Sequence, residues 1–407
     1  MTKLKTVLGI TALALMGAVF AATPGSCAEK TLTIGVSDAL TGPGATYGLP
    51  QANAVKMAVS EINAAGGIKV GGDVYKLDVI AYDDKANPTE GINSVRKLID
   101  RDGVKHILGF CCSGPTSAVA SFIANENALM LVGNAAERAI TTQGAENLFR
   151  TRPPADYTGA AAGAFVASRG VKTVAVLGAL EISFYMQYVD SFKRIFEEKG
   201  GKIVAMESFS NKDRDMTPQL TKIKALNPDA ILVPGYVEPA SFVYRQAAEL
   251  GMKMERYGFT SGSEEQFLKA ASSEQMEGVW DLRPIELVIQ EGSKGKAFYD
   301  NYSKMYGTPP SPSAPYAYDQ TYVLKHAMEK AGTVDDIGKL VAAIRKLPIP
   351  SEAVMQYIPI GGYMFDQNGQ AYIKNGAFQW QKGKWVHVTD LPSDVDGYSK
   401  FLRSLRK

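Results

Sequence analysis

The sequence predicts an α/β fold of parallel sheets flanked by helices, divided into two lobes. Short apolar runs rich in β-branched residues alternate with helical patterns almost throughout, which is typical of parallel sheets covered on both faces. The chain has 407 residues, more than one core usually serves, because a domain takes about 150 residues. The alternation also breaks at 150–154 and then restarts, which indicates a first crossing between the lobes.

The predicted strands are short apolar runs, and the predicted helices are the amphipathic segments between them. The strands are expected at 31–36, 76–82, 106–110, 129–132, 173–177, 203–208, 230–233 and 257–260. The helices are expected at 52–64, 88–101, 116–124, 157–168, 185–199, 217–226 and 239–250. Many of these helices end at a glycine, which closes the last turn at low steric cost.

The pattern changes after residue 283. Consecutive helices are predicted at 295–306, in a stretch after Pro315, and at 334–347. A tail of short strands follows through 363–365, 378–380 and 385–387, with a turn at 366–369. This order predicts that the chain crosses between the lobes more than once.

The first 28 residues have the pattern of an export leader. Lys3 and Lys5 precede an apolar run at 7–22, and small residues surround Cys27. The run is short for a membrane span, and no stop-transfer segment follows it. We therefore expect cleavage after Ala28 and an exported, soluble mature protein. Lipid attachment at Cys27 is the alternative, which the preceding Pro24 disfavours.

Charge and motif content exclude several function classes. The chain has 44 basic and 42 acidic residues, and loss of Lys3 and Lys5 with the leader leaves 42 of each. A neutral protein is a poor partner for nucleic acid or anionic membranes. The histidines, His106, His326 and His387, are far apart, and no metal-ligand spacing or G-x-x-x-x-G-K loop is present. We expect no catalytic residue, no metal and no cofactor.

The segment 40–48, Leu-Thr-Gly-Pro-Gly-Ala-Thr-Tyr-Gly, follows the first predicted strand and leads into an amphipathic helix. Glycines and small hydroxyl residues let the backbone approach a ligand closely, and Tyr47 offers a flat apolar face with a polar tip. The segment is predicted to be a binding loop.

The chain resembles the branched-chain amino-acid binding protein family, the type I periplasmic solute-binding proteins of ABC importers. The fragments that carry the resemblance keep their order and spacing over nearly all of the mature chain: 40–48, 61–68, 82–84 with Pro88, 109–113, 129–130, 234–236, 245–247 and 378–380. The resemblance implies two Rossmann-like lobes joined by three crossover hinge segments, with the ligand in the cleft between them. The first lobe would comprise 29–151 plus 283–357, and the second 152–282 plus 358–407. A periplasmic monomer that delivers its ligand to a membrane permease is implied as well.

Several candidate ligand contacts follow from matching positions. Tyr47 matches a cleft aromatic, although packing against its own lobe would also explain it. Ser113 and Gly114 lie at a strand-to-helix junction, where a hydroxyl, free N–H groups and the helix dipole favour a carboxylate. An ordinary N-cap is the alternative for Ser113. The remaining matches are Asn134, Ala135 and Ala136, which would offer backbone groups, and Tyr236, an aromatic of the second lobe.

The sequence departs from the family at three places. Ala136 stands where the family has a threonine hydroxyl, and Thr260 where it has the glutamate that neutralises a bound ammonium group. A buried ammonium without a counter-charge is costly, so selectivity for α-amino acids is in doubt; Glu181 or Glu238 would be the substitutes. Around 181–185, Phe184 or Tyr185 takes the aromatic place, which with Phe110 predicts an aromatic cleft. The predicted ligand is a small carboxylate with an aromatic or other apolar body.

Cys111 and Cys112 leave two alternatives open. Cys112 is also a candidate ligand contact, and in the family it often bonds to a cysteine whose place Ala86 takes here. The two adjacent residues would form either a strained disulfide or two free thiols. Other functions remain as alternatives: an amino-acid binding protein of the same importer class, a ligand-sensing subunit, or a thiol hydrolase on Cys112, for which the nearest histidine, His106, lies one strand length away.

Overall fold

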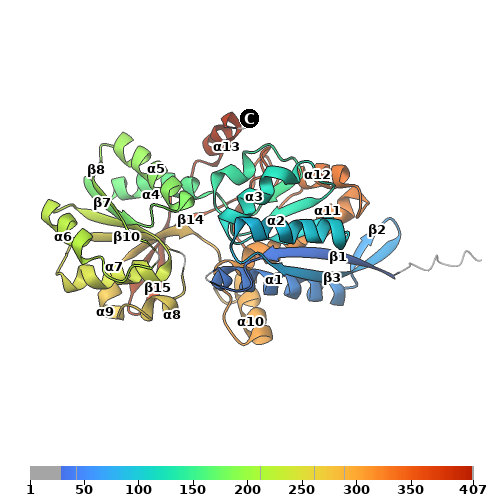
Figure 1. Cartoon of the computed structure of the whole chain (residues 1–407), viewed down its shortest axis with the longest axis horizontal. Coiled ribbons are helices and arrows are strands. Elements are labelled where there is room, and N and C mark those ends of the chain that lie inside the picture. Colours follow the sequence, from blue (N-terminus) through green and yellow to red (C-terminus); the bar gives the residue numbers. More distant parts are fainter. Residues whose placement is uncertain (1–28, 43, 211, 261, 288, 406–407) are drawn as a thin grey trace, which may run out of the picture.

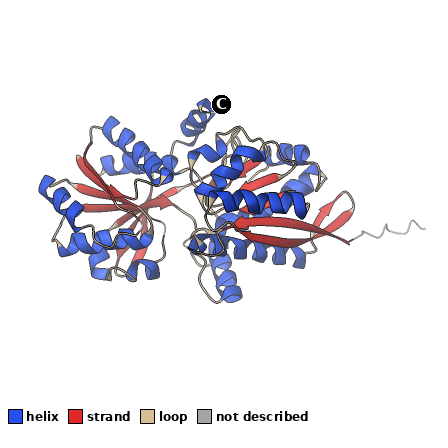
Figure 2. Cartoon of the chain, viewed as in Figure 1, coloured by secondary structure: helices blue, strands red, loops and turns tan. Residues whose placement is uncertain are grey.

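The structure, a computed structural model, describes residues 29–42, 44–210, 212–260, 262–287 and 289–405. The predicted export leader and Cys27 lie outside the described residues. The described chain forms two lobes, each an open sheet flanked by helices (Figure 1, Figure 2). The predicted α/β class is confirmed.

The first lobe contains a six-stranded sheet in the order β2-β3-β1-β4-β5-β6. Its strands are β1 (Glu29–Asp38), β2 (Ile68–Val70), β3 (Asp73–Asp83), β4 (His106–Gly109), β5 (Leu129–Val132) and β6 (Leu148–Arg150). All neighbours pair in parallel except β2 with β3. The helices of this lobe are α1 (Ala45–Ala64), α2 (Pro88–Arg96), α3 (Ser113–Ile123), α10 (Lys294–Tyr306), α11 (Ala314–Ala331) and α12 (Ile337–Arg345). A π-helical turn (Lys97–Arg101), a 3-10 turn (Arg138–Thr141) and a small sheet of β12 (Tyr357–Ile358) and β13 (Tyr372–Ile373) complete it.

The second lobe contains a seven-stranded sheet in the order β15-β14-β11-β10-β9-β7-β8. Its strands are β7 (Thr173–Gly178), β8 (Lys202–Ser208), β9 (Ala230–Pro234), β10 (Glu255–Phe259), β11 (Trp280–Pro284), β14 (Asn375–Gln381) and β15 (Lys384–Asp390). The last two run antiparallel at one edge. The helices are α4 (Ala155–Ser168), α5 (Ser183–Glu198), α6 (Thr217–Leu226), α7 (Val237–Glu249), α8 (Glu264–Leu268) and α9 (Ser273–Met276), and α13 (Val395–Ser404) ends the described chain.

The chain passes between the lobes three times. The first crossing joins β6 to α4, the second joins β11 to α10, and the third joins β13 to β14. The hydrophobic core of the first lobe continues through Met364, Phe365 and Ile373. We therefore propose that the last crossing lies at Lys374 and not at 357/358, because apolar side chains of the intervening segment belong to the first-lobe core.

Helix α1 begins earlier than the sequence predicted. It starts at Ala45 and not at residue 52, so Tyr47 lies in the first helical turn and the binding loop is shorter. Pro50 lies in the second turn of this helix, where its missing N–H costs one backbone hydrogen bond. Gly48 is required here, since a Cβ atom at this position would overlap the backbone of Ala39. This close approach fixes Tyr47 beside the end of β1.

Two glycines also hold the second lobe together near the cleft. A Cβ atom on Gly159 or Gly163 of α4 would press on the α5 backbone at Tyr188 or Phe192. The two helices therefore pack at backbone contact, which positions the N-terminus of α5, with Phe184 and Tyr185, toward the first lobe.

Short elements were missed by the sequence prediction. Strands β2 and β6 have three residues each, too few to show an alternating pattern. The predicted strand at 363–365 pairs only through isolated bridges. Helix α13 was also missed; it packs back on the chain through buried Leu402 and Ser399.

Candidate functional site

A cavity lies between the lobes at the carboxyl ends of the strands, where open α/β sheets bind ligands. Its inner part, which we call the inner chamber, has a volume of about 50 Å³ for the centre of a water-sized sphere. The first lobe contributes Tyr47, Cys111, Cys112, Ser113, Asn134, Ala136, Pro312 and Ser313, the first crossing contributes Arg152, and the second lobe contributes Phe184, Tyr185, Tyr236, Phe259 and Thr260.

A second cavity, which we call the outer chamber, adjoins the inner one and has a volume of about 660 Å³. The two chambers share Tyr47, Cys112, Ser113, Phe184 and Tyr236. The rest of the outer wall consists of Gly44, Thr46, Ala86, Gly114, Ile182, Val237, Glu238, Pro239, Gln266 and Lys269.

The structure brings most of the predicted site residues together. Nine line the inner chamber, namely Tyr47, Cys112, Ser113, Asn134, Ala136, Phe184, Tyr185, Tyr236 and Thr260, and Gly114 lines the outer one. Phe110 and Ala135 do not line either chamber. Both are packed in the first-lobe core, because the φ angle of 64° at Phe110 turns its side chain inward. Their roles are indirect: the Ala135 N–H donates to the Phe110 carbonyl, which fixes the turn that carries Cys111 to Ser113.

Ser113 has a different local role from the one expected. Cys112 occupies the N-cap position and Ser113 is the first residue of α3. The Ser113 Oγ accepts hydrogen bonds from the backbone N–H groups of Ala136 and Glu137, both at 3.2 Å. The N–H of Ala136 is therefore engaged within the protein, while the Ser113 hydroxyl retains its hydrogen for donation.

Arg152 was missed by the sequence reasoning, yet among the residues that the structure describes it is the only charged one that lines the inner chamber. It is 8% exposed. Its Nη1 donates to the backbone oxygen of Asn134 at 2.8 Å and to the side-chain oxygen at 2.7 Å. Its Nε has no hydrogen-bond partner among the described residues. The arginine is visible in the sequence within the first crossing, at 150–154. The sequence analysis used that segment only to place the boundary between the lobes.

Acidic groups near the inner chamber are engaged elsewhere. Arg283 pairs with Asp281 at 3.1 Å and with Glu286 at 2.6 Å, and all three side chains are largely buried. The other Asp281 oxygen accepts the backbone N–H of Thr260 at 3.0 Å. Glu238 lies on the outer chamber and pairs with Arg214 at 3.2 Å. No carboxylate lines the inner chamber among the described residues.

Aromatic rings of both lobes meet across the cavity. The ring centroids of Tyr47 and Tyr236 are 6.0 Å apart, and those of Tyr185 and Tyr236 are 5.6 Å apart. Phe184 lies against Tyr185 with centroids at 4.1 Å. Burial raises the pKa of the Tyr47 and Tyr236 hydroxyls, so both remain neutral donors. The Tyr47–Tyr236 contact spans the cleft.

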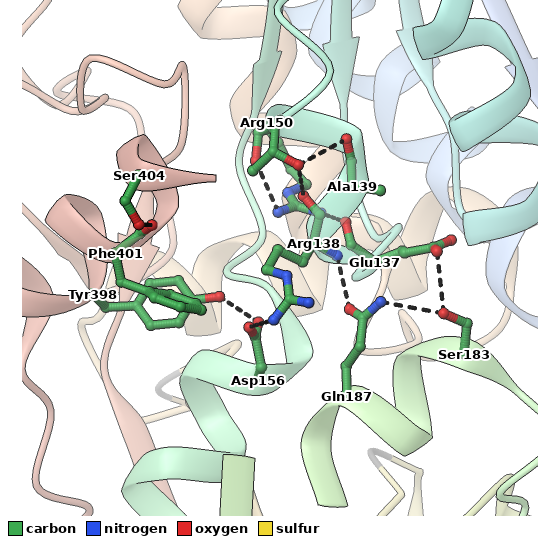
Figure 3. Close-up of polar contacts among 12 residues, drawn as sticks. Glu137, Arg138, Ala139, Arg150, Asp156, Ser183, Gln187, Tyr398, Phe401 and Ser404 are labelled. Atoms are coloured by element: carbon green, nitrogen blue, oxygen red, sulfur yellow. Dashed lines mark hydrogen bonds and ion pairs between the residues drawn. The ribbon is translucent and has the colours of Figure 1, made fainter. Parts of the chain in front are cut away.

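Polar contacts join the lobes beside the cleft (Figure 3). The Glu137 carboxylate of the first lobe accepts a hydrogen bond from Ser183 of α5 at 3.1 Å. The Arg138 backbone N–H donates to Gln187 of the same helix at 2.9 Å. The Gln187 amide also donates to Ser183 at 3.2 Å. These contacts require the two lobes to be close together.

An ion pair and the C-terminal helix extend this contact (Figure 3). The Arg138 guanidinium donates to Asp156 of α4 at 3.0 Å. The second Asp156 oxygen accepts a hydrogen bond from Tyr398 of α13. The guanidinium of Arg138 also lies 5.7 Å from the centroid of Phe401. Helix α13 thus contacts residues on both sides of the first crossing.

The two cysteines are free thiols whose sulfur atoms lie 2.7 Å apart. Cys111 is buried, and burial raises the pKa of its thiol above the ordinary range. Cys112 is half-buried and lines both chambers. Ala86 lines the outer chamber together with Cys112. It takes the place where the resemblance implies a cysteine bonded to Cys112.

We expect iodoacetamide to alkylate Cys112 before Cys111, because the first thiol faces the cavity and the second is buried with a raised pKa. A bound ligand should slow the reaction at Cys112. Peptide mass mapping after timed alkylation without reductant measures both. Protection of both residues until reductant is added would instead show a disulfide between them.

His106 is not arranged as a base for Cys112. Its Nε2 lies 2.7 Å from the carbonyl oxygen of Val334, and burial lowers its pKa to about 4. The imidazole is therefore neutral, and its contact is with the Val334 carbonyl and not with Cys112. This contact gives the thiol-hydrolase alternative no support.

Two buried carboxylates lie under the cavity wall. Asp38 accepts the Cys111 backbone N–H at 2.9 Å, and Asp84 accepts the Ala86 N–H at 2.8 Å. Burial raises the pKa of both groups, and that of Asp84 rises to about 6. Each side chain also has one oxygen without a hydrogen-bond partner among the described residues.

Asp84 is expected to make the protein less stable as the pH rises. Its folded-state pKa of about 6 is above the value of 3.8 for the unfolded chain, so its stabilising contribution is full below pH 4 and is lost as the pH rises through 6. The loss should be about 2 kcal/mol. Urea unfolding from pH 4.5 to 7.5 should show this decline in the wild type and a smaller one in Asp84→Asn. Parallel profiles for both proteins would contradict the assignment.

The fold and the site define a two-lobed solute-binding protein with an interlobe cleft. The chain belongs to the periplasmic binding protein family, whose model matches residues 31–384. The resemblance to Leu/Ile/Val-binding proteins is confirmed: the chain is 28% identical to the leucine-, isoleucine-, valine-, threonine- and alanine-binding protein of Pseudomonas aeruginosa, over 88% of this chain and 92% of that protein.

Solved structures have the same fold. The branched-chain amino acid transporter substrate-binding protein LivJ of Streptococcus pneumoniae, in complex with isoleucine, is 24% identical with a TM-score of 0.75, covering 90% of this chain and 100% of that one. A solute-binding protein of an ABC transporter from Rhodopseudomonas palustris, in complex with benzoate, is 19% identical with a TM-score of 0.73, covering 90% and 98%. Within the described part of this chain, no helix has both the length and the apolar character needed to cross a membrane.

Proposed function

We propose that this protein is the periplasmic substrate-binding component of an ABC importer and that it takes a small carboxylate with an aromatic or other apolar body. The observation that carries the proposal is Arg152, a buried cation on the cavity wall with an unpartnered Nε. A ligand carboxylate would satisfy this group with a charge-assisted hydrogen bond. The hydroxyl of Ser113 would donate from the neighbouring wall.

The shape of the cavity supports an apolar ligand body. Tyr47, Phe184 and Tyr236 line both chambers, and Tyr185 lines the inner one. The Rhodopseudomonas palustris protein of the same fold binds benzoate, which agrees with this chemistry. The relatives named for leucine, isoleucine and valine support the second candidate, an amino-acid ligand. That candidate requires a partner for the ammonium group, and none of the described residues that line the inner chamber is a carboxylate.

Ligand binding would act by shifting an open–closed equilibrium. The three crossings serve as the hinge, and closure brings the Tyr47 and Tyr236 rings together over the ligand. The contacts of Glu137 and Arg138 with α5 and α4 would stabilise the closed form. The closed form would then dock on a membrane permease as a monomer, or on a receptor in the sensing alternative.

A thermal-shift panel tests the ligand class. Aromatic and other apolar monocarboxylates should raise the melting temperature, since a ligand at 100 times its Kd stabilises by about 2.7 kcal/mol. Leucine, isoleucine and valine should have little effect, and amides matched to the acids should be inactive. Strong stabilisation by the amino acids with the acids silent would overturn the proposal.

A further inference from the structure

The inner chamber is much smaller than the outer one, so the two chambers would hold different parts of one ligand. The inner chamber, at about 50 Å³, is several times smaller than the roughly 300 to 1,000 Å³ of a pocket that encloses a whole ligand, so it accepts only one end of a ligand, such as a carboxylate. The outer chamber of about 660 Å³ lies in the range of ordinary ligand pockets.

The wall between the chambers and the far wall have different chemistry. The shared residues are mostly aromatic, and Ile182, Val237 and Pro239 continue the apolar surface into the outer chamber. Beyond them lie Thr46, Glu238 and Lys269, whose side chains face solvent. A ligand in this cavity therefore meets a cation first, an apolar passage next, and water at the far end.

We propose that the outer chamber is a second subsite and that the ligand is an elongated arylalkanoic or arylalkenoic acid, with a spacer between its carboxylate and its ring. This rests on the proposed function, because the carboxylate is placed at Arg152. The spacer runs along the edges of the Tyr47 and Tyr236 rings, whose centroids are 6.0 Å apart, and the aryl ring lies against Ile182, Val237 and Pro239. An acid whose ring is joined directly to the carboxylate leaves that apolar wall exposed.

The experiment compares acids of two lengths on wild-type protein and on variants that fill the outer chamber. By calorimetry, 3-phenylpropenoate should bind the wild type about tenfold more tightly than benzoate, because more apolar surface is buried. Thr46→Trp and Glu238→Trp, at exposed positions on opposite walls, should weaken 3-phenylpropenoate at least tenfold and benzoate less than threefold. Glu197→Trp, an exposed position on α5 away from the chamber, is the matched control.

The outcomes separate the two proposals. Equal affinity for both acids, together with no effect of either tryptophan variant, would overturn the second subsite and leave the carboxylate function standing. Failure of both acids to bind, with binding of an amino acid, would overturn the proposed function itself. Circular dichroism of each variant checks that the fold is retained.

Discussion

Arg152→Met is expected to weaken binding of an apolar carboxylate by more than about a hundredfold. The substitution removes the one charge that the described residues contribute to the inner chamber and keeps a flexible side chain in its place. Removing one partner of a buried, hydrogen-bonded charge pair costs about 2 to 5 kcal/mol of binding free energy. Calorimetric titration with 3-phenylpropenoate measures the loss.

Two further variants make this result specific. Arg152→Lys retains the charge without the planar guanidinium, so we expect an intermediate loss. Arg169→Met removes an arginine that pairs with Glu255 outside the cavity, at 3.1 Å, and should leave the affinity unchanged. An Arg152→Met protein that binds the acid within threefold of the wild type would show that the carboxylate is held elsewhere.

Asp156→Ala is expected to destabilise the protein by about 3 kcal/mol and to weaken ligand binding as well. Asp156 is 2% exposed and accepts hydrogen bonds from Arg138 and Tyr398. Breaking a buried pair leaves the partners unsatisfied, which costs about 3 to 5 kcal/mol. The lower figure applies because Arg138 is partly exposed. Binding should weaken because the contact between Arg138 and Asp156 joins the two lobes.

Urea unfolding and calorimetry measure the two effects of Asp156→Ala. Asp300→Ala is the matched control, since Asp300 belongs to an exposed pair with Lys296 on α10 and such pairs contribute at most about 1 kcal/mol. Tyr398→Phe removes only the bond from α13 and should show a smaller loss of stability. An unchanged unfolding free energy in Asp156→Ala would mean that the interlobe ion pair is not formed in solution.

The sequence by itself determined the α/β class, the two lobes and most of the wall of the inner chamber. Apolar runs alternating with helical periods are local signals, and they located β1, β5 and α6 to within a few residues. Tyr47, Ser113 and Tyr236 were found at positions that match the family, and Tyr47 and Ser113 also because each follows a recognisable strand, whose carboxyl end lies at the ligand-binding edge of the sheet. The missing counter-charge at Thr260 was likewise visible in the sequence.

Only the tertiary structure decided the role of Arg152 and the length of the cavity. A charge in a crossing segment has no periodic signal, and its burial depends on Asn134 and on both lobes meeting around it. Phe110 was assigned to the cavity from its neighbours, yet its backbone angle turns the ring into the core. The contact of Tyr398 with Asp156 joins residues 242 positions apart, and such pairings are set by packing of the whole chain, which local sequence patterns do not encode.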